Sequence, residues 1–453
     1  MNRSQLSKSW QQVVVLAAIA LLALAIRLHY VHTAVVDHPL RGDATQYFSY
    51  AWNVVHHRVF SIAPPESEAP TPDSFRDPGY PIFLAGIIAL RGDTQAFYTT
   101  TLDIQAILSA LTVALYTFLA RRWLGFVAAV TVGLGLTFWP HSITLAGYLL
   151  SETLVGFFIA VGLWCLQLGL ERRSRTNIVA SGIAFAAAGL TNAVIVPAAP
   201  LFAGAMAWRD RANRARWLCL LLAATLPCAA WILRSSQLPP NLTSSSRVAM
   251  NFVQGSWPEY HSAWFAAISG DPAAKATLSL IDNDITRLHG DRLAGVAAIL
   301  ERMERAPMRY LAWYASKPVE LWGWSIGIGQ GDIYVYPTFA SPLTGTGPLR
   351  SITDLLYFAN PFLMLLALAG VAAILTTLGR REPALVFAIL LGVYATCVFT
   401  VLQADARYAV PYRGIEWVAI AAAIVAMANW SKKHRPRRGR FIDPIDLRDG
   451  HHS

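Results

Sequence analysis

Residues 11–31 read QQVVVLAAIALLALAIRLHYV, an apolar run that meets a charge only near its end. A helix needs about 20 apolar residues to cross the hydrocarbon core of a bilayer. Arg3 and Lys8 precede the run, so we expect the N-terminus to face the cytoplasm. A cleaved signal peptide is the alternative, but the run is long for one, and Arg27 and His29 replace the small residues of a cleavage site. We therefore predict an uncleaved membrane helix.

The composition of the whole chain agrees with a membrane protein. Of its 453 residues, 55% are hydrophobic and 14% are charged, and the mean hydropathy is +0.41. A soluble globular chain has about 25% charged residues, so an ordinary cytosolic enzyme and a disordered protein are excluded. We predict an all-α polytopic membrane protein with about ten spans and both termini in the cytoplasm. The nine predicted spans after the first are residues 97–119, 125–139, 144–169, 177–190, 192–207, 216–233, 351–378, 383–402 and 413–429.

Basic residues gather in short runs between the apolar stretches and give the chain a net charge of +10. Such runs are typical of cytoplasmic loops beside anionic lipid, and no nucleic-acid reading motif accompanies them. The apolar stretch 78–90 has only about 13 residues, too few to span comfortably. Counting it as a span would place the next basic runs outside, so we predict a helix lying in the outer interface. The basic runs along the whole chain are Arg121-Arg122, 172–175, 209–216, Arg380-Arg381 and 432–440.

Two long segments are expected outside the membrane. Residues 32–96 contain the interfacial helices, and the segment from 234 to 350 is too long for a connector and contains a predicted helix near Asp291 to Arg305. We therefore divide the chain into an N-terminal transmembrane module, an extracytoplasmic loop region, C-terminal transmembrane helices and a basic cytoplasmic tail. Their bounds are residues 1–233, 234–350, 351–430 and 431–453.

Cysteine and histidine spacing predicts no metal site. All four cysteines fall inside apolar runs, which also argues against a disulfide framework. His56 and His57 are adjacent, so on a helix they point in different directions. The sequence also contains no Walker A loop or dinucleotide glycine pattern. No cofactor is therefore predicted with certainty, and a divalent cation stays open.

Asp43 lies about a dozen residues beyond the first span and is the candidate catalytic residue. Tyr47 is four residues further on, so the two share a helix face. A carboxylate held at the water–lipid boundary could accept a proton from a substrate hydroxyl. The alternative is structural, because Asp43 followed by Gln46 fits a capping box.

Other polar residues stand beside the predicted spans. Arg76 could bind a phosphate, and Asp77 could form an ion pair with Arg76. The alternative is structural, because a turn followed by a helix start would explain the same residues. Glu152 is predicted about two turns inside a span, where an unpaired acid is costly. Arg407 follows the ninth span, and an arginine fork suits phosphate, although a snorkelling interface residue is the alternative. The predicted substrate-binding residues are Gln46, Tyr47, Arg76, Tyr80, Glu152, Arg234, Lys317, Arg407 and Tyr408.

The order of seven short motifs resembles the GT-C membrane glycosyltransferases, specifically family 39 and its relatives, over roughly residues 10–430. Those relatives include the protein O-mannosyltransferases and the aminoarabinose transferases of lipid A. The motifs are Asp43-x-x-x-Tyr47, Arg76-x-Pro-Gly-Tyr-Pro81, Ser151-Glu152, Gly189-Leu190-Thr191, Trp231-Ile-Leu-Arg234, Asn251-Phe-Val-Gln-Gly255 and Arg407-Tyr408-x-x-Pro411.

This resemblance implies an inverting transferase that uses a polyprenyl-phosphate sugar on the outer face of the inner membrane. It implies that Asp43 deprotonates an acceptor lipid, glycan or protein. Arg407 would hold the donor phosphate, with Arg76 and Lys317 as helpers. Two other functions stay open: a flippase of lipid-linked sugars or another secondary transporter, and an inactive scaffold of the cell envelope.

Overall fold

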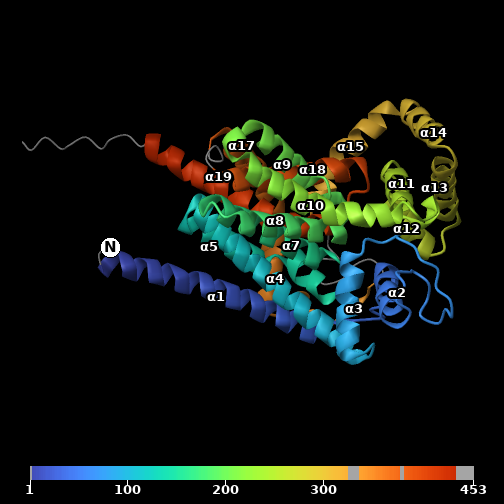
Figure 1. Cartoon of the computed structure of the whole chain (residues 1–453), viewed down its shortest axis with the longest axis horizontal. Helices are drawn as coiled ribbons and strands as arrows, with labels where there is room; N and C mark the ends of the chain where they lie inside the picture. Colours follow the sequence, from blue (N-terminus) through green and yellow to red (C-terminus); the bar gives the residue numbers. More distant parts are fainter. Residues whose placement is uncertain (1–2, 325–335, 378–381, 435–453) are drawn as a thin grey trace, which may run out of the picture.

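The computed structural model describes residues 3–324, 336–377 and 382–434 (Figure 1). The basic pair Arg380-Arg381 and the tail beyond residue 434 lie outside the described residues. All ten predicted spans form helices. They are α1 (Arg3–Thr33), α4 (Gln95–Leu124), α5 (Phe126–Phe138), α7 (Glu152–Glu171), α8 (Arg175–Thr191), α9 (Ala198–Arg209), α10 (Arg214–Ser235), α17 (Pro348–Thr376), α18 (Pro383–Val401) and α19 (Arg413–His434).

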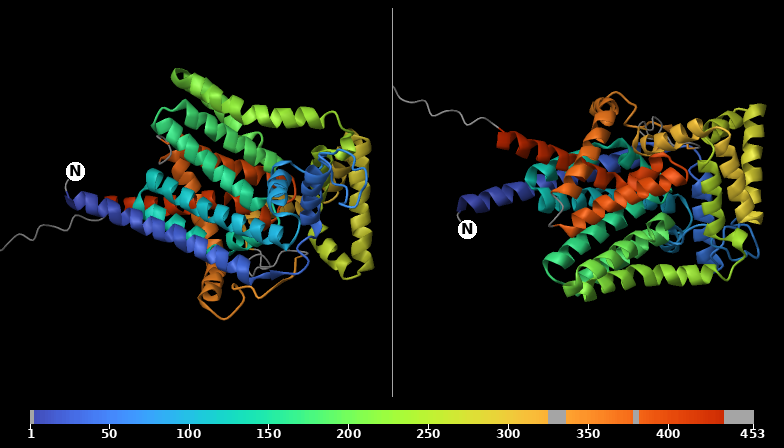
Figure 2. Two further views of the ribbon diagram at one scale, coloured as in Figure 1. Left: turned by 60° about the horizontal axis from the view of Figure 1, so that its bottom comes forward. Right: turned by 90° about the horizontal axis from the view of Figure 1, so that it is seen from above.

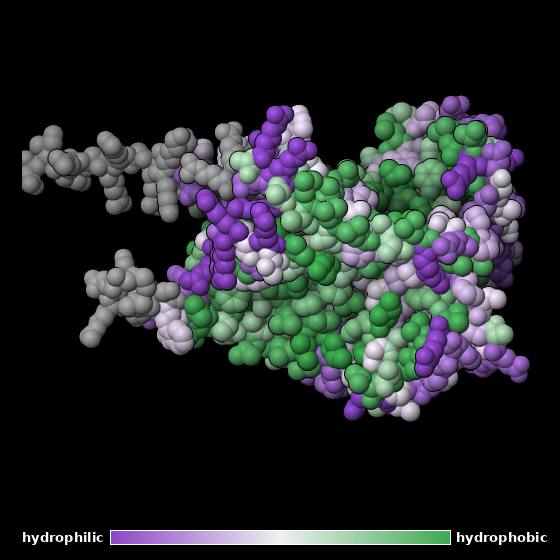
Figure 3. Space-filling model, viewed as in Figure 1, coloured by the Kyte–Doolittle hydropathy of each residue, from purple (hydrophilic) through white to green (hydrophobic). Residues whose placement is uncertain are grey.

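Seven stretches of the described chain are long and apolar enough to cross a membrane. An eighth is counted if α5 and the following short helices, α6 (Pro140–Thr144) and η1 (Leu145–Gly147), make one span bent by 60°. The predicted spans 177–190 and 192–207 correspond to shorter helices, since α8 has 17 residues and α9 has 12. Hydrophobic side chains form a broad band across the middle of the molecule, with hydrophilic ones at its two ends (Figure 3). The protein is therefore a multi-pass helical membrane protein.

The helices pack closely enough to bury polar groups inside the bundle. At Gly370, α17 passes so close to α19 that a Cβ there would clash with the carbonyl oxygen of Ala419. Small residues at such crossings are typical of membrane helices. Arg27 of α1 is fully buried, and its guanidinium donates to Ser109 Oγ at 2.7 Å and to the carbonyl of Leu136 at 2.9 Å. Arg27 also donates two hydrogen bonds to other backbone carbonyls. Together these bonds compensate for the burial of its positive charge in the apolar interior.

The two outer segments cover one end of the bundle. The described N-terminus and the C-terminal end of α19 lie at the opposite end (Figure 1). The first outer segment contains α2 (Gly42–His56) and α3 (Gly79–Arg91), and α3 runs across the direction of the long helices, as an interfacial helix would. The second contains η4 (Pro240–Leu242), α11 (Ser244–Gly255), α12 (Tyr260–Ile268), α13 (Pro272–Gly290), α14 (Arg292–Glu304) and α15 (Pro307–Trp322).

Several contacts join the two outer segments. Strand β1 (Val35–Val36) pairs antiparallel with β2 (Thr338–Phe339), and an isolated bridge joins Ser74 to Thr243. The predicted helix near Asp291 to Arg305 is confirmed as α14, whose N-cap Asp291 accepts from the backbone of Leu293. Helices α11 to α14 stand across the end of the bundle (Figure 2). The outer segments therefore form one cover over this end.

Candidate active site

Asp43 lies in the first turn of α2, at the inner side of this cover. The helix starts at Gly42, whose φ of 49° is in the left-handed region that glycine adopts without strain. Tyr336 fixes this start, because its hydroxyl donates to the carbonyl of Arg41 at 2.6 Å and accepts from the amide of Ala44. The residue at the N-cap is Arg41, without a side-chain cap. The capping-box interpretation of Asp43 is therefore wrong.

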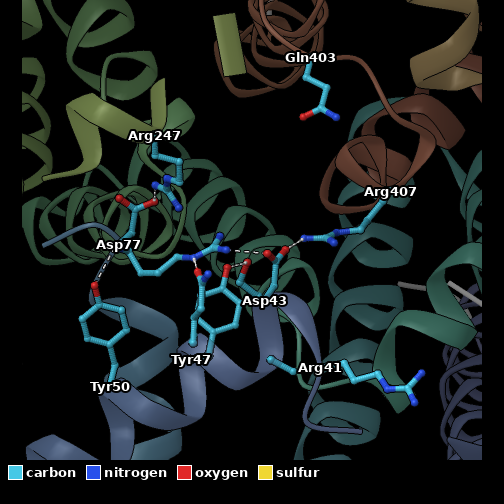
Figure 4. Close-up of polar contacts among 12 residues, drawn as sticks. Arg41, Asp43, Tyr47, Tyr50, Asp77, Arg247, Gln403 and Arg407 are labelled. Carbon is cyan, nitrogen blue, oxygen red and sulfur yellow. Dashed lines mark hydrogen bonds and ion pairs between the residues drawn. The ribbon is translucent and has the colours of Figure 1, made fainter. Parts of the chain in front are cut away.

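Two arginines from distant parts of the chain bind the carboxylate of Asp43 (Figure 4). Arg76 Nη2 donates to Oδ1 at 2.5 Å, and Arg407 Nη2 donates to Oδ2 at 2.6 Å. Arg76 also donates through Nε to Gln46 Oε1 at 2.6 Å, and its guanidinium lies 5.2 Å from the centre of the Tyr47 ring. Both arginine side chains are about nine-tenths buried, at 11% and 10% exposure, so these are protected ion pairs.

Arg407 connects Asp43 to a second acid. It lies in η6 (Ala406–Tyr412), where the Asp405 side chain accepts from its backbone amide at 2.8 Å. Its Nε donates to Glu152 Oε1. Glu152 is only 5% exposed, and among the described residues its second oxygen has no hydrogen-bond partner. Arg407 thus bridges two carboxylates.

Glu152 does not lie where the hydropathy pattern predicted it. It is the first residue of α7, not a residue two turns inside a span. The chain bends after Phe138 and passes through α6 and η1 before α7 begins. Pro140 at the start of α6 cannot continue the hydrogen bonding of the preceding helix. The bend therefore places Glu152 at the helix end, beside η6.

The charges around Asp43 control its protonation. Burial by itself would raise the pKa of Asp43, because a charged group loses solvation. The positive charges and hydrogen bonds of Arg76 and Arg407 outweigh burial and hold the pKa below its usual value. The same ion pair raises the pKa of Arg76. Asp43 is therefore an ionised carboxylate in this state of the protein.

Asp77 forms a second ion pair beside the first. Its Oδ2 accepts from Arg247 Nη2 at 2.6 Å and from the backbone amide of Ala193 at 3.1 Å. The prediction that Asp77 pairs with Arg76 is therefore wrong. Asp77 instead fixes α11 and the break between α8 and α9 to the start of α3.

These groups line a cavity of about 460 Å³. Its wall comes from α2, the segment just before α3, the start of α7, the break after α8, α11, α12, the end of α18 and η6. Charged and apolar side chains both line it. The apolar lining includes Val194, Val248, Met250, Val398, Phe399 and Leu402.

The other predicted substrate-binding residues differ in their access to the cavity. Tyr47 and Tyr408 line it. Gln46 lies behind Arg76 and contacts it through the bond described above. Tyr80 is fully buried, donates to Gln105 Oε1 at 2.7 Å and packs edge-to-face on Tyr47, with ring centres 5.0 Å apart. Gln46 and Tyr80 therefore support the residues that line the cavity.

Arg234 and Lys317 do not line the cavity, contrary to the prediction that they contact the substrate. Arg234 Nη1 donates to the carbonyl of Asp73 at 2.7 Å, and its guanidinium stacks 4.7 Å from Trp231. Lys317 is fully buried, and its ammonium donates to three backbone carbonyls, those of Gly255, Thr400 and Leu402, at 2.5 to 2.9 Å. An ammonium has three protons, so Lys317 has none left for a phosphate.

We expect Lys317→Met to destabilise the protein by at least about 2 kcal/mol, because three buried carbonyls would lose a charged donor. The measurement is the thermal unfolding midpoint of the purified protein in detergent, with exposed Lys275→Met on α13 as the control. The folded fraction of the variant should keep the wild-type KM for its donor. Unchanged stability with a raised donor KM would instead make Lys317 a phosphate ligand.

Several lining residues were not predicted as site residues. Arg247, Asn251 and Gln254 recur on one face of α11, and His261 of α12 is 2.9 Å from Gln403 Nε2. The spacing of 247, 251 and 254 is a helical signal that could have indicated a polar face toward the cavity. The motif Asn251-Phe-Val-Gln-Gly255 had marked this segment only as part of the resemblance.

The acids of the cavity are not arranged as a metal site. Among the described residues, no group of three or more His, Cys, Asp or Glu gathers in one place. Asp43 and Glu152 share Arg407, whose guanidinium takes an oxygen of each. A divalent cation on these two acids would first have to displace that arginine, so the residues present do not fit one.

Comparisons with known proteins show the fold. No family model and no curated protein matches the chain. The oligosaccharyltransferase of Archaeoglobus fulgidus in its apo form is 14% identical, with a TM-score of 0.51, over 94% of this chain and 51% of that chain. Its complex with Zn and sulfate is 15% identical, with a TM-score of 0.51, over 92% and 50%. ArnT from Cupriavidus metallidurans is 17% identical, with a TM-score of 0.37, over 94% and 79%.

The chain thus spans about half the length of the oligosaccharyltransferase that it matches. The expected fold is confirmed: the protein has the GT-C fold of polytopic membrane glycosyltransferases. At these identities the likeness concerns the fold alone. Membership of family 39 stays a prediction.

Proposed function

We propose that the protein is an inverting glycosyltransferase that moves a sugar from a polyprenyl phosphate to an acceptor lipid, glycan or protein. The observation that carries this proposal is the Asp43 carboxylate, held by two arginines inside a cavity at one end of a membrane bundle. Such a cavity offers a base for an acceptor hydroxyl and cations for a phosphate leaving group. The GT-C fold supports the same class of reaction.

In the proposed reaction, the acceptor hydroxyl gives its proton to Asp43 and its oxygen attacks the anomeric carbon of the donor sugar. The bond from that carbon to the phosphate oxygen breaks, and its electron pair leaves with the polyprenyl phosphate. Arginine stabilises the charge that develops on the phosphate. Attack from the face opposite the leaving group inverts the anomeric carbon.

The apolar lining of the cavity suits the lipid part of the donor. Phe399 and Leu402 come from the outer end of α18, and Val248 and Met250 come from α11. These residues lie in the same cavity as the arginines, so the first isoprene units could contact them while the phosphate meets the charged part. Burial of each CH₂ contributes about 0.8 kcal/mol, so the lipid would add to the binding of the phosphate.

Charge distribution supports an extracytoplasmic position for the cavity. Arg121, near the end of α4, donates to Gln12 in the first turns of α1, and Arg122 pairs with Glu171 at the end of α7. The N-terminal turns of α1, and with them the end of α4, lie at the end of the bundle away from the outer segments (Figure 1). Basic residues favour the cytoplasmic side, so we place the cavity on the opposite side of the inner membrane.

The test uses the purified full-length protein in proteoliposomes that contain polyprenyl-phosphate sugars in a panel of sugar types. We expect one donor to be converted to free polyprenyl phosphate while a glycosylated acceptor from a membrane extract appears, both followed by mass spectrometry. Liposomes without protein are the control. A donor that crosses the bilayer chemically unchanged would contradict the proposal and favour the flippase alternative.

A further inference from the structure

The charged groups that line the cavity are all engaged with each other. They are three carboxylates, Asp43, Asp77 and Glu152, and three guanidiniums, Arg76, Arg247 and Arg407, so their formal charges cancel. Each of the six takes part in at least one of the ion pairs described above. Among the described lining residues, no arginine is left unpaired for an anion. A phosphate that enters this cavity therefore competes with a carboxylate for whichever arginine it binds.

Arg76 and Arg407 differ in the groups behind them. Arg76 contacts a single carboxylate, that of Asp43. Its other side-chain partners, Gln46 and the rings of Tyr47 and Phe75, are neutral. Arg407 contacts two carboxylates, and one of them, Glu152, is almost fully buried behind it. A phosphate on Arg407 would be repelled by Glu152 in a region of low dielectric constant. A phosphate on Arg76 meets no second acid once Asp43 has moved.

From this charge arrangement we infer that the donor phosphate displaces Asp43 from Arg76, so that Asp43 becomes an effective base only after the donor has bound. This inference rests on the function proposed above. Gln46 and Tyr47 hold Arg76 in place when Asp43 leaves, and Arg407 keeps Asp43 Oδ2 at 2.6 Å. The freed atom is Oδ1, which accepts from Arg76 in the structure described here.

The displacement changes the chemistry of Asp43 in the direction that the reaction needs. While both arginines bind it, the carboxylate is a weak base, because its pKa is held below the usual value. Loss of the Arg76 contact and the arrival of a negative phosphate both raise its proton affinity. Oδ1 can then take the proton of the acceptor hydroxyl, whose oxygen bonds to the anomeric carbon as the phosphate leaves on Arg76. Donor therefore binds before acceptor is activated.

Binding of polyprenyl phosphate, the product that keeps the phosphate, tests the inference without any transfer step. The dissociation constant is measured for the full-length protein in detergent micelles. Asp43→Asn should bind about tenfold more tightly than wild type, since no carboxylate competes for Arg76. Exposed Asp93→Asn, at the junction of α3 and α4, removes the same charge outside the cavity and should bind like wild type.

A second pair of variants tells the two arginines apart. Arg76→Gln should weaken binding of polyprenyl phosphate by about tenfold or more. The double variant Arg407→Gln with Glu152→Gln removes one positive and one negative charge together, which avoids a lone buried charge. It should weaken binding much less than Arg76→Gln. Size-exclusion chromatography shows whether each variant folds. If Asp43→Asn does not fold, the comparison of Arg76→Gln with the double variant still tests the inference.

Two outcomes would overturn the inference. One is a folded Asp43→Asn protein that binds polyprenyl phosphate no more tightly than wild type. The other is a double variant that loses as much binding as Arg76→Gln or more. If wild type transfers sugar and binds polyprenyl phosphate in these cases, only the displacement is wrong. If wild type neither binds nor transfers, the proposed function itself fails.

Discussion

Asp43→Asn should reduce the rate of glycosyl transfer by about 10²–10⁴-fold, because an amide cannot accept the proton of the acceptor hydroxyl. The amide also cannot form the two ion pairs that Asp43 makes with Arg76 and Arg407. The measurement is the initial rate of product formation by mass spectrometry, with equal amounts of folded protein and saturating donor. If donor binding becomes tighter while this rate falls, the loss belongs to the chemical step.

The control for this variant is Asp93→Asn, an exposed acid on the same end of the molecule. It should transfer at the wild-type rate, which separates loss of the base from a general change of surface charge. A folded Asp43→Asn protein that keeps the wild-type rate would contradict the assignment of Asp43. Glu152, the other acid bound to Arg407, would then be the first residue to test as the base.

Arg407→Ala should lower the stability of the folded protein by about 3–5 kcal/mol, the cost of leaving a buried charge without its partner. Glu152 is 5% exposed, and Arg407 is the partner of its Oε1. The same change removes one of the two arginines on Asp43. The measurement is the shift of the thermal unfolding midpoint in detergent, since this shift follows the loss of free energy.

An exposed ion pair provides the comparison for Arg407. Arg305, the residue after α14, pairs with Glu301 of α14. Their side chains are 74% and 64% exposed, and such pairs contribute little. Arg305→Ala should therefore leave the unfolding midpoint almost unchanged. If Arg407→Ala and Arg305→Ala shift the unfolding midpoint equally, the claim that Arg407 compensates a buried charge is wrong. Adding Glu152→Gln to Arg407→Ala should recover part of the lost stability, because the lone charge disappears.

The membrane helices could be predicted because the bilayer allows few solutions. A chain crossing lipid must satisfy its backbone hydrogen bonds internally, so each long apolar run has to become a helix. The same rule does not say where a helix bends. The run 144–169 looked continuous by hydropathy, yet α7 begins only at Glu152, after the turn that Pro140 starts. The predicted position of Glu152 two turns inside a helix was therefore wrong, although the run does contain a helix.

The meeting of Asp43, Arg76 and Arg407 was only partly predictable. Their positions beside predicted spans placed them on one side of the membrane, and the structure brings them together. Lys317 has a similar position in the sequence, but three backbone carbonyls converge on it. Which carbonyls converge depends on long-range packing of α11, α15 and α18, and no spacing along the chain encodes it.

Arg247 was missed for a related reason. It belongs to α11, a helix of 12 residues that no long apolar run marks. Its partner Asp77 lies 170 residues away, in another outer segment. These segments also pair through β1, β2 and the Ser74–Thr243 bridge, and pairings of only one or two residues leave little pattern in a sequence.

An experimental structure of the protein with polyprenyl phosphate bound tests most directly whether the Asp43 cavity is the donor site. We predict that the phosphate lies in this cavity on Arg76, that the first isoprene units contact the apolar lining around Phe399, and that Asp43 Oδ1 no longer accepts from Arg76. A phosphate bound outside the cavity, or at the end of the bundle that holds Arg121 and Arg122, would contradict the donor site and with it the role of Asp43.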